Sequence, residues 1–266
     1  MLSALANPGT FMRWSRPAVP AFALATVVVA AIGVYLGLFV APPDYQQGET
    51  VRIMFVHVPA AWLAMSFYML TAASAFGSLV WRHPLADVSQ RAAAPIGAVF
   101  ALVCLVTGSL WGKPMWGTYW VWDARLTSML VLFLMYGGII ALWRTVDDPG
   151  RAARAVSILT LVGLVNIPII KFSVDWWFTL HQGASVLRMS GPTIHSSILG
   201  PLLTMAAAFT LLGVTLHLAG MRTEILRRRV RRLTLTQAER LDGGSIAIIS
   251  APRPHPDPPP PVGVSA

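Results

Sequence analysis

Long apolar runs alternate with short polar segments along most of this chain. Six of the runs approach or exceed the roughly 20 residues that an α-helix needs to cross the hydrocarbon core of a bilayer. They lie at residues 18–41, 53–80, 92–110, 124–143, 153–170 and 197–220. The pattern therefore predicts an all-α membrane protein, built as a bundle of six transmembrane helices.

Polar residues and helix breakers mark where these helices end or bend. The sequence Pro42-Pro43-Asp44 follows the first run directly and ends it. Asp123 stands just before the fourth run, where an N-cap residue would stand. Asn166 and Pro168 lie near the end of the fifth run, and they predict a local kink rather than a substrate path.

The remaining segments complete the expected domain organisation. We expect a cytoplasmic N-terminus at 1–17 and a six-span membrane domain at 18–220. The tail at 221–266 is basic at first and then rich in proline, a composition typical of a segment without fixed structure. The chain thus predicts a single membrane domain with two short cytoplasmic ends.

Composition supports the membrane assignment and excludes other classes. Only 12% of the residues are charged and the mean hydropathy is +0.63, whereas a soluble domain has about 25% charged residues. The net charge of +9 could suggest a nucleic-acid partner, but the basic residues lie mostly in the tail and in short loops. We therefore expect no nucleic acid, and we attribute the charge to topology and anionic lipid. The single cysteine, Cys104, excludes an intrachain disulfide.

The distribution of Lys and Arg predicts the orientation in the membrane. Fifteen of these residues fall on the side of the two termini and five on the other side. Cytoplasmic loops are the ones enriched in Lys and Arg, so both termini should be cytoplasmic. The loops at 42–52, 111–123 and 171–196 should then lie outside.

The stretch at 111–127 is the most unusual part of the chain. It holds four of the ten tryptophans, namely Trp111, Trp116, Trp120 and Trp122, together with Tyr119, Asp123 and Arg125. If residues 115–122 are helical, Trp116 and Trp120 share a face; if they are extended, Trp120 and Trp122 share one instead. The residues alone leave this choice open. They also leave open an ordinary interfacial aromatic belt, although a belt usually spreads over several helix ends.

Three of the six histidines lie at or near the predicted outer face: His57, His181 and His195. Histidines at membrane depth are rare and need partners, and imidazole is a common axial ligand of haem iron. A haem held by two histidines needs one on each side of the ring, a flat apolar surface, and cations for its propionates. The outer face offers His57, a second histidine, the tryptophans, and Arg125, Lys113 or Arg188.

Other chemistries lack their usual residues. The predicted spans contain no acidic pair of the kind that proton-coupled transporters use. No P-loop is present, so an ATP-driven step would have to come from a partner. A cytochrome b type of redox protein, which keeps haem as a permanent cofactor, would need more histidines within the spans. It is nevertheless retained as the alternative to haem delivery.

Several motifs resemble a known family. Residues 111–127 look like the tryptophan-rich "WWD" signature of haem-handling proteins. Ala41-Pro-Pro-Asp-Tyr-Gln-Gln-Gly48, His57-Val-Pro-Ala-Ala61, Ala94-Pro-Ile-Gly-Ala-Val-Phe100 and Asp175-Trp-Trp-Phe-Thr-Leu-His-Gln-Gly183 are similar to segments of the cytochrome c maturation protein C family (CcmC, haem exporter protein C). The resemblance covers residues 18–220. It departs at Tyr119, where many relatives have Trp, and at Met129, where some have an acidic residue.

The resemblance implies a set of binding residues. His57 and His181 would be the two axial ligands of the haem iron, and no family role falls on His195. The haem-binding residues would be His57, His181, Trp111, Trp116, Tyr119, Trp120, Trp122, Asp123 and Arg125. Haem b would be the transferred substrate rather than a resident cofactor, and no catalytic residue is implied.

The resemblance also implies a biological setting. The protein would lie in the bacterial inner membrane, with its haem site facing the periplasm, and would serve c-type cytochrome biogenesis. It would deliver haem to a membrane-anchored haem chaperone, maturation protein E. Its other partners would be an ABC-type ATPase with its membrane subunit (maturation proteins A and B) and a further small membrane protein (maturation protein D). We therefore expect a haem-delivery protein, and the resemblance leaves open whether it also assists the covalent attachment of haem to the chaperone.

Overall fold

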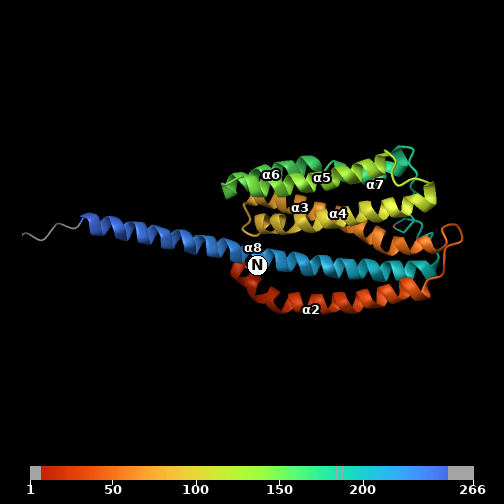
Figure 1. Ribbon diagram of the computed structural model, residues 1–266, viewed down its shortest axis with the longest axis horizontal. Helices are drawn as coiled ribbons and strands as arrows, with labels where there is room; N and C mark the ends of the chain where they lie inside the picture. Colours follow the sequence, from red (N-terminus) through yellow and green to blue (C-terminus); the bar gives the residue numbers. More distant parts are fainter. Residues whose placement is uncertain (1–6, 184, 187, 251–266) are drawn as a thin grey trace, which may run out of the picture. The chain divides into compact units, whose positions relative to one another are not determined.

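The computed structural model describes residues 7–183, 185, 186 and 188–250, and describes side chains as far as residue 238. All regular elements in these residues are helical (Figure 1). In chain order they are α2 (Pro8–Tyr35), η1 (Leu36–Val40), η2 (Glu49–Ile53), α3 (Met54–Trp81), α4 (Ala86–Trp116), α5 (Ala124–Thr145), α6 (Pro149–Gly163), α7 (Asn166–Trp176) and α8 (Ser196–Ser250).

The predicted fold class is confirmed. Within the part of the chain that the structure describes, six helical stretches are long and apolar enough to cross a membrane: Pro8–Val40, Glu49–Trp81, Ala86–Trp116, Ala124–Thr145, Pro149–Trp176 and Ser196–Ala238. The predicted kink in the fifth stretch is also present, because the helix is interrupted between Gly163 and Asn166. Asn166 donates a hydrogen bond from its side chain to the Ser128 carbonyl, 2.9 Å away, which ties the start of α7 to α5.

Helices are longer than the sequence predicted at both ends of the chain. The first begins at Pro8, because the Asn7 side chain caps the N–H groups of Gly9 and Thr10 and proline suits the first helical position. The last continues to Ser250, past the predicted end of the sixth span at residue 220. Residues 221–242 contain neither Gly nor Pro and many good helix formers. The Pro-rich remainder at 251–266 lies outside the described residues.

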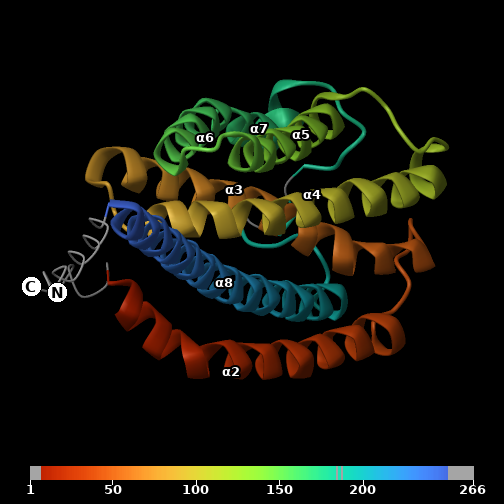
Figure 2. The same cartoon turned by 60° about the vertical axis from the view of Figure 1, so that its left-hand side comes forward.

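The contacts divide the chain into two compact units, residues 1–225 and residues 226–266. The site described below lies within the first unit. In that unit the main core is formed by α3, α4, α5, α6 and α7 (Figures 1 and 2). Two buried tyrosines join its helices, since Tyr136 donates to the Ala64 carbonyl over 2.7 Å and Tyr68 to the Thr160 carbonyl over 3.2 Å. Gly97 and Gly163 leave the space that these hydroxyl groups occupy.

A second group of contacts brings distant parts of the chain to one end of the bundle. Buried side chains from the residue after η1, from η2, from the start of α3 and from the start of α8 pack together, among them Val51, Phe55 and Leu202. The end of α4 and the start of α5 lie at the same end, as does the end of α7 (Figure 1). We call this the tryptophan end, because residues 111–123 belong to it. It therefore gathers all three histidines that the sequence predicted for one face.

Candidate functional site

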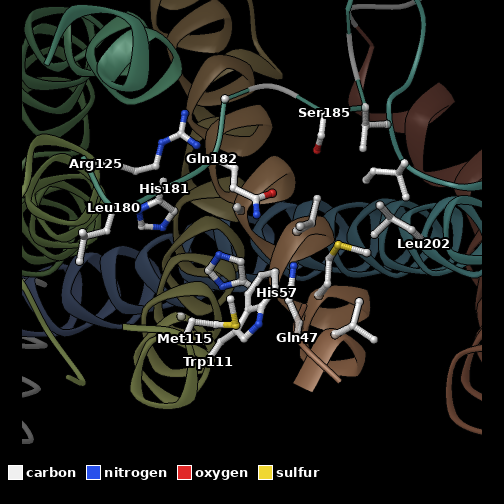
Figure 3. Close-up of a pocket in the computed structure, with 18 of the residues that line it drawn as sticks. Gln47, His57, Trp111, Met115, Arg125, Leu180, His181, Gln182, Ser185 and Leu202 are labelled. Carbon is white, nitrogen blue, oxygen red and sulfur yellow. The ribbon is translucent and has the colours of Figure 1, made fainter. Parts of the chain in front are cut away.

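A cavity of about 900 Å³ opens at the tryptophan end. Its size falls in the upper part of the range of ligand pockets, about 300–1,000 Å³. The walls come from α3, α4, α5, α7, the start of α8 and the loop that follows η1 (Figure 3). Apolar side chains form much of its surface, including Met54, Trp62, Met65, Met115 and Met129. The cavity can therefore hold a large and mainly apolar ligand.

His57 reaches the cavity from the first turn of α3 (Figure 3). Its Nδ1 atom lies 3.1 Å from the Cys104 carbonyl oxygen and 3.1 Å from the Thr107 hydroxyl oxygen, both on α4. The ring also meets the edge of Trp111, with centroids 5.6 Å apart. Among the described residues nothing hydrogen-bonds Nε2, and protein atoms do not enclose it. Nε2 is therefore open to a ligand in the cavity.

His181 reaches the same cavity from the connection between α7 and α8 (Figure 3). Its ring lies against Trp116, with centroids 5.0 Å apart. Nδ1 is enclosed by protein and lies 3.7 Å from the Asp123 carboxylate, which is an ion-pair distance rather than a hydrogen bond. Nothing in the described chain bonds Nε2, which stays accessible. Two imidazoles thus present an open Nε2 to one cavity.

The protonation of His181 suits a metal ligand. Burial lowers the pKa of its imidazole from 6.5 to about 4, and the positive charge of Arg125 contributes to this lowering. The carboxylate of Asp123 opposes both effects and raises the pKa of His181. The ring is therefore neutral at neutral pH, and one of its nitrogens carries a lone pair that can bind a metal ion.

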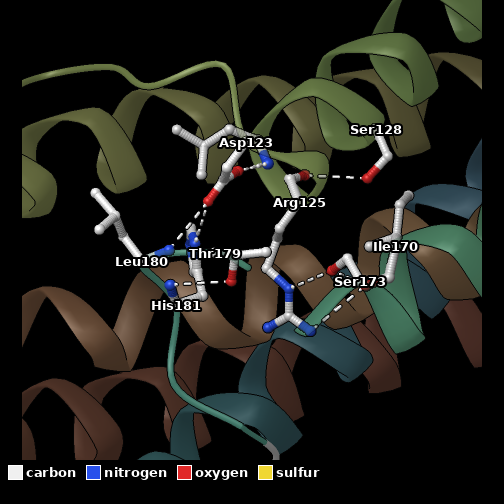
Figure 4. Close-up of polar contacts among 9 residues, drawn as sticks. Asp123, Arg125, Ser128, Ile170, Ser173, Thr179, Leu180 and His181 are labelled. Carbon is white, nitrogen blue, oxygen red and sulfur yellow. Dashed lines mark hydrogen bonds and ion pairs between the residues drawn. The ribbon is translucent and has the colours of Figure 1, made fainter. Parts of the chain in front are cut away.

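Asp123 joins the tryptophan-rich stretch to the loop that carries His181 (Figure 4). It is the N-cap of α5, as predicted, and accepts the Leu126 N–H over 2.8 Å. Its second carboxylate oxygen accepts the Leu180 N–H over 3.4 Å and faces His181. Only 8% of the side chain is exposed, so this charge is poorly screened by solvent. Asp123 holds the loop in place without lining the cavity itself.

Arg125 supplies a positive charge to the cavity wall. Its Nε donates to the Ser173 hydroxyl over 3.1 Å, and its Nη2 lies 3.4 Å from the Ile170 carbonyl oxygen (Figure 4). The Lys171 carbonyl oxygen also lies 3.4 Å from Nη2. Among the described residues no carboxylate pairs with it within 4.0 Å. The guanidinium is thus held by neutral acceptors, and it remains able to bind an anionic group of a ligand.

The tryptophan-rich stretch changes conformation at Gly117. Residues up to Trp116 complete α4, Gly117 takes a left-handed conformation with φ 76°, and the following residues run without helix to Asp123. Trp120 and Trp122 contact each other edge to face with centroids 5.5 Å apart. The helix thus ends at Trp116, residues 117–119 form bends and residues 120–123 have no regular structure, so neither of the two conformations considered from the sequence describes the whole stretch.

The structure brings together most, but not all, of the predicted site residues. Six of them line the cavity: His57, His181, Trp111, Trp116, Trp120 and Arg125. Tyr119 and Trp122 do not line it, and they are 56% and 77% exposed. Neither ring therefore belongs to the cavity wall.

The cations and histidines named as alternatives are separated by the structure. Lys113 donates to the Gly117 carbonyl and lies over the Tyr119 ring, away from the cavity, and Arg188 does not line the cavity either. Lys171, for which the sequence predicted no role, lines it instead. His195 lines the cavity too, but its Nδ1 is engaged by Ser197 at 2.8 Å.

The residues that sequence reasoning missed lack a local signal. Trp62 and the methionines of the cavity wall lie in or beside ordinary apolar runs, so the sequence does not distinguish them from lipid-facing or core residues. Thr107 and Gly108 look like any small residues in a membrane helix. Only the packing of α4 against α3 reveals that they face His57.

The fold and the cavity define a class: a polytopic helical membrane protein with two histidines and a tryptophan-rich wall around one ligand cavity. Comparison with known proteins gives the family. The heme exporter protein C family matches residues 1–236 of this chain. The chain belongs to that family.

Individual relatives agree with this assignment. The heme exporter protein C of Bradyrhizobium diazoefficiens is 64% identical over 237 residues, which cover 89% of this chain and 90% of that protein. The heme exporter protein C of Escherichia coli K12 is 51% identical over 214 residues, 80% of this chain and 86% of that protein. A protein of Marchantia polymorpha described as a putative cytochrome c biosynthesis ccmC-like mitochondrial protein is 49% identical over 181 residues, 68% of this chain and 76% of that protein.

Proposed function

We propose that the cavity binds haem b between His57 and His181 as a transferred substrate, and that the protein delivers it for c-type cytochrome biogenesis. The names of the relatives support the general role, because they refer to heme export and to cytochrome c biosynthesis. The particular ligands, the kind of haem and the acceptor are our inference.

One observation supports the proposal most directly: two imidazoles with an open Nε2 face one cavity of about 900 Å³. Among the described residues no group of three or more His, Cys, Asp or Glu could hold a bare metal ion. Two imidazoles suffice for iron when a porphyrin supplies the equatorial ligands. The donor set therefore fits haem better than it fits a free cation.

The rest of the wall suits the other parts of the haem molecule. Trp111, Trp116 and Trp120 offer flat apolar surface to the ring. Arg125 and Lys171 offer positive charge to the propionates. Asp123 acts indirectly, by holding the loop of His181.

Delivery requires an acceptor outside the cavity. We propose the membrane-anchored haem chaperone, maturation protein E, as the acceptor, with Tyr119 and Trp122 as exposed contacts for it. The expected partners of the complex are the ABC-type ATPase with its membrane subunit (maturation proteins A and B) and the small membrane protein called maturation protein D. We place the protein in the bacterial inner membrane, and the charge distribution supports an orientation with the tryptophan end on the outer, periplasmic side. In this scheme the protein transfers haem without acting as an enzyme.

The test is the visible spectrum of the full-length protein purified with its partners. We expect a low-spin, six-coordinate haem in the wild type, and its loss in His57→Ala and in His181→Ala. His195→Ala is the matched control, since it removes an imidazole from the same cavity without removing a proposed ligand. A wild type without haem would refute the proposal.

A second measurement separates delivery from a permanent cofactor. Adding the chaperone in excess should drain haem from the wild-type protein. Haem that stays bound at every chaperone concentration would favour the alternative of a membrane redox protein.

A further inference from the structure

We infer that α4 carries a socket for the imidazole of His57, made by the Cys104 carbonyl, the Thr107 hydroxyl and the bare Cα of Gly108. The socket fixes which nitrogen of the ring carries the proton and which way the other nitrogen points. The inference rests on the proposed function, because it concerns how His57 is prepared to bind iron. Thr107 and Gly108 are positioning residues, since neither is a ligand.

The hydrogen bonds of the socket determine the tautomer. The Thr107 hydroxyl has a single proton, and the two groups that accept it are both carbonyls, that of Val103 at 2.6 Å and that of Cys104 at 3.3 Å. Toward His57 its oxygen can therefore only accept, and the Cys104 carbonyl oxygen can only accept as well. Nδ1 must then carry the proton and donate it to these two oxygens. In the neutral ring this leaves the lone pair on Nε2, the atom that is open to the cavity.

Gly108 determines the distance between the ring and α4. A Cβ atom at this position would lie 2.9 Å from Cε1 of His57, and 3.4 Å from Nδ1. The first distance is too short for two carbon atoms, and the near neighbour is a ring rather than a flexible chain end. Any side chain at residue 108 would therefore push the imidazole away from both acceptors.

His195 shows that the cavity does not impose this tautomer on every histidine. Its Nδ1 lies 3.3 Å from the backbone N–H of Ser197, a group that can only donate. Nδ1 must accept there, so the proton of the neutral ring sits on Nε2. The nitrogen that points away from Ser197 then has no lone pair for iron. The socket thus distinguishes His57 from another histidine in the wall of the same cavity.

Hydrogen bonding at Nδ1 also changes the strength of the ligand. A metal-binding histidine that donates to a carbonyl becomes a stronger electron donor, and loss of such an outer partner typically lowers metal affinity about 10–100-fold. Stronger donation favours ferric over ferrous iron and lowers the reduction potential. Removing one of the two acceptors should therefore raise the potential of the bound haem.

The first test replaces the hydroxyl in the full-length protein with its partners. Thr107→Val should weaken haem binding about tenfold, the lower end of the outer-partner range because one acceptor remains. It should also shift the reduction potential to a more positive value, whereas Thr107→Ser should restore both quantities. Thr71→Val is the matched control, since Thr71 is a buried helical threonine that bonds only the Phe67 carbonyl.

The second test fills the space at the ring. Gly108→Ala should lower haem occupancy at least about tenfold and turn the low-spin spectrum toward a high-spin, five-coordinate one. Gly137→Ala is its control, because a Cβ there meets nothing within 4 Å. Alanine is also the better helix former, so a failure to fold is not expected in either variant. Thermal unfolding of both apoproteins checks this point.

The outcomes separate the two proposals. A wild type without haem refutes the proposed function, and the socket falls with it. A wild type that binds haem through His57 and His181, while Thr107→Val and Gly108→Ala leave affinity, potential and spectrum unchanged, refutes the socket alone.

Discussion

The two histidines of the cavity are held by different kinds of structure. His57 belongs to a helix and is fixed by groups of a second helix, with two acceptors at 3.1 Å and no room to move toward Gly108. His181 belongs to the connection between two helices, and its Nδ1 has only a carboxylate at 3.7 Å. His57 is thus held in one orientation, whereas His181 can move more easily because it lies on a loop with fewer contacts. We call His57 the rigid ligand and His181 the yielding ligand.

This difference matters under the proposed function, in which the protein must release the haem that it binds. Transfer of haem requires that one axial bond breaks before the other, or that the acceptor replaces a ligand. Loops move more readily than packed helices, because fewer contacts oppose their motion. We therefore expect His181 to leave the iron first, while His57 holds the haem until the acceptor has bound.

The largest effect should come from removing the ligands one at a time. His57→Gly should lower haem affinity by more than about 100-fold, beyond what loss of an outer partner causes. His181→Gly should lower it less, because the fixed ligand remains. Titration of the apoproteins with haem, followed in the Soret band, measures both values.

Added imidazole sharpens the same experiment. It should restore the six-coordinate spectrum of His181→Gly more readily than that of His57→Gly, since a loop opens more easily to a small molecule than a helix interface does. Equal losses and equal rescue in the two variants would contradict the assignment of a rigid and a yielding ligand.

A smaller effect is expected from replacing Asp123, which holds the loop of His181. Asp123→Ala removes an N-cap, which costs about 0.5–2 kcal/mol, and also releases the loop of His181. We expect haem affinity to fall about tenfold, as for the loss of an outer partner. Isothermal or spectroscopic titration would measure the loss.

Two variants separate the effect of losing an N-cap from the effect of releasing the loop of His181. Asp148→Ala removes the N-cap of α6, where Asp148 accepts the Arg151 N–H, and should destabilise the fold similarly without weakening haem binding. Asp123→Asn keeps a good N-cap residue but loses the charge. If Asp148→Ala weakened haem binding as much as Asp123→Ala, the effect would be one of general stability.

The pH dependence of the low-spin spectrum tests the charges around His181. The pKa of the metal-free His181 ring is lowered to about 4, and bound iron would compete with the proton, so the wild type should keep its low-spin spectrum at least down to about pH 4. Arg125→Gln removes a positive charge and raises this pKa toward 6.5, so the spectrum should be lost at a higher pH. Asp123→Asn removes the opposing charge and should shift the loss to a lower pH. Identical acid titrations of all three proteins would show that His181 is not the group that titrates.

The same pKa affects the apoprotein. Between pH 6.5 and about 4 the unfolded chain binds a proton at His181 that the folded chain does not. The free energy of unfolding should therefore fall as the pH drops through this range. His181→Gln should remove this part of the pH dependence of thermal unfolding.

The sequence predicted the helices well, because apolar runs of spanning length leave few alternatives to a helix. It also predicted Asp123 as a cap from its position before an apolar run. It could not predict that the last helix extends past residue 220, since basic composition describes an exposed helix as well as a disordered segment. The earlier start of the first helix does have a local signal in the sequence, because Asn7 is a good N-cap residue and is followed directly by Pro8.

Within the site, the sequence predicted which kinds of residue are present, but it did not predict which of them contact one another. Histidines and tryptophans are unusual enough at one membrane face to be noticed. Whether Trp122 faces the cavity or solvent depends on the turn at Gly117, and Thr107 meets His57 only because α3 and α4 pack together. Such contacts join residues about 50 positions apart, as with His57 and Thr107, and no local pattern contains them.

The smallest effect should come from the two tryptophans that flank the histidines. Trp111 meets His57 at 5.6 Å and Trp116 meets His181 at 5.0 Å, and ring contacts of this kind contribute about 0.5–1.5 kcal/mol. Trp111→Phe should change haem affinity little, because the socket still orients His57. Trp116→Phe should lower it a few-fold, because His181 has fewer other contacts to hold its ring. Trp122→Phe, outside the cavity, is the control and should bind haem as the wild type does. If Trp111→Phe lowered haem affinity more than Trp116→Phe, the orientation of His57 would depend on Trp111 more than on α4. That result would contradict the assignment of His57 as the rigidly held ligand.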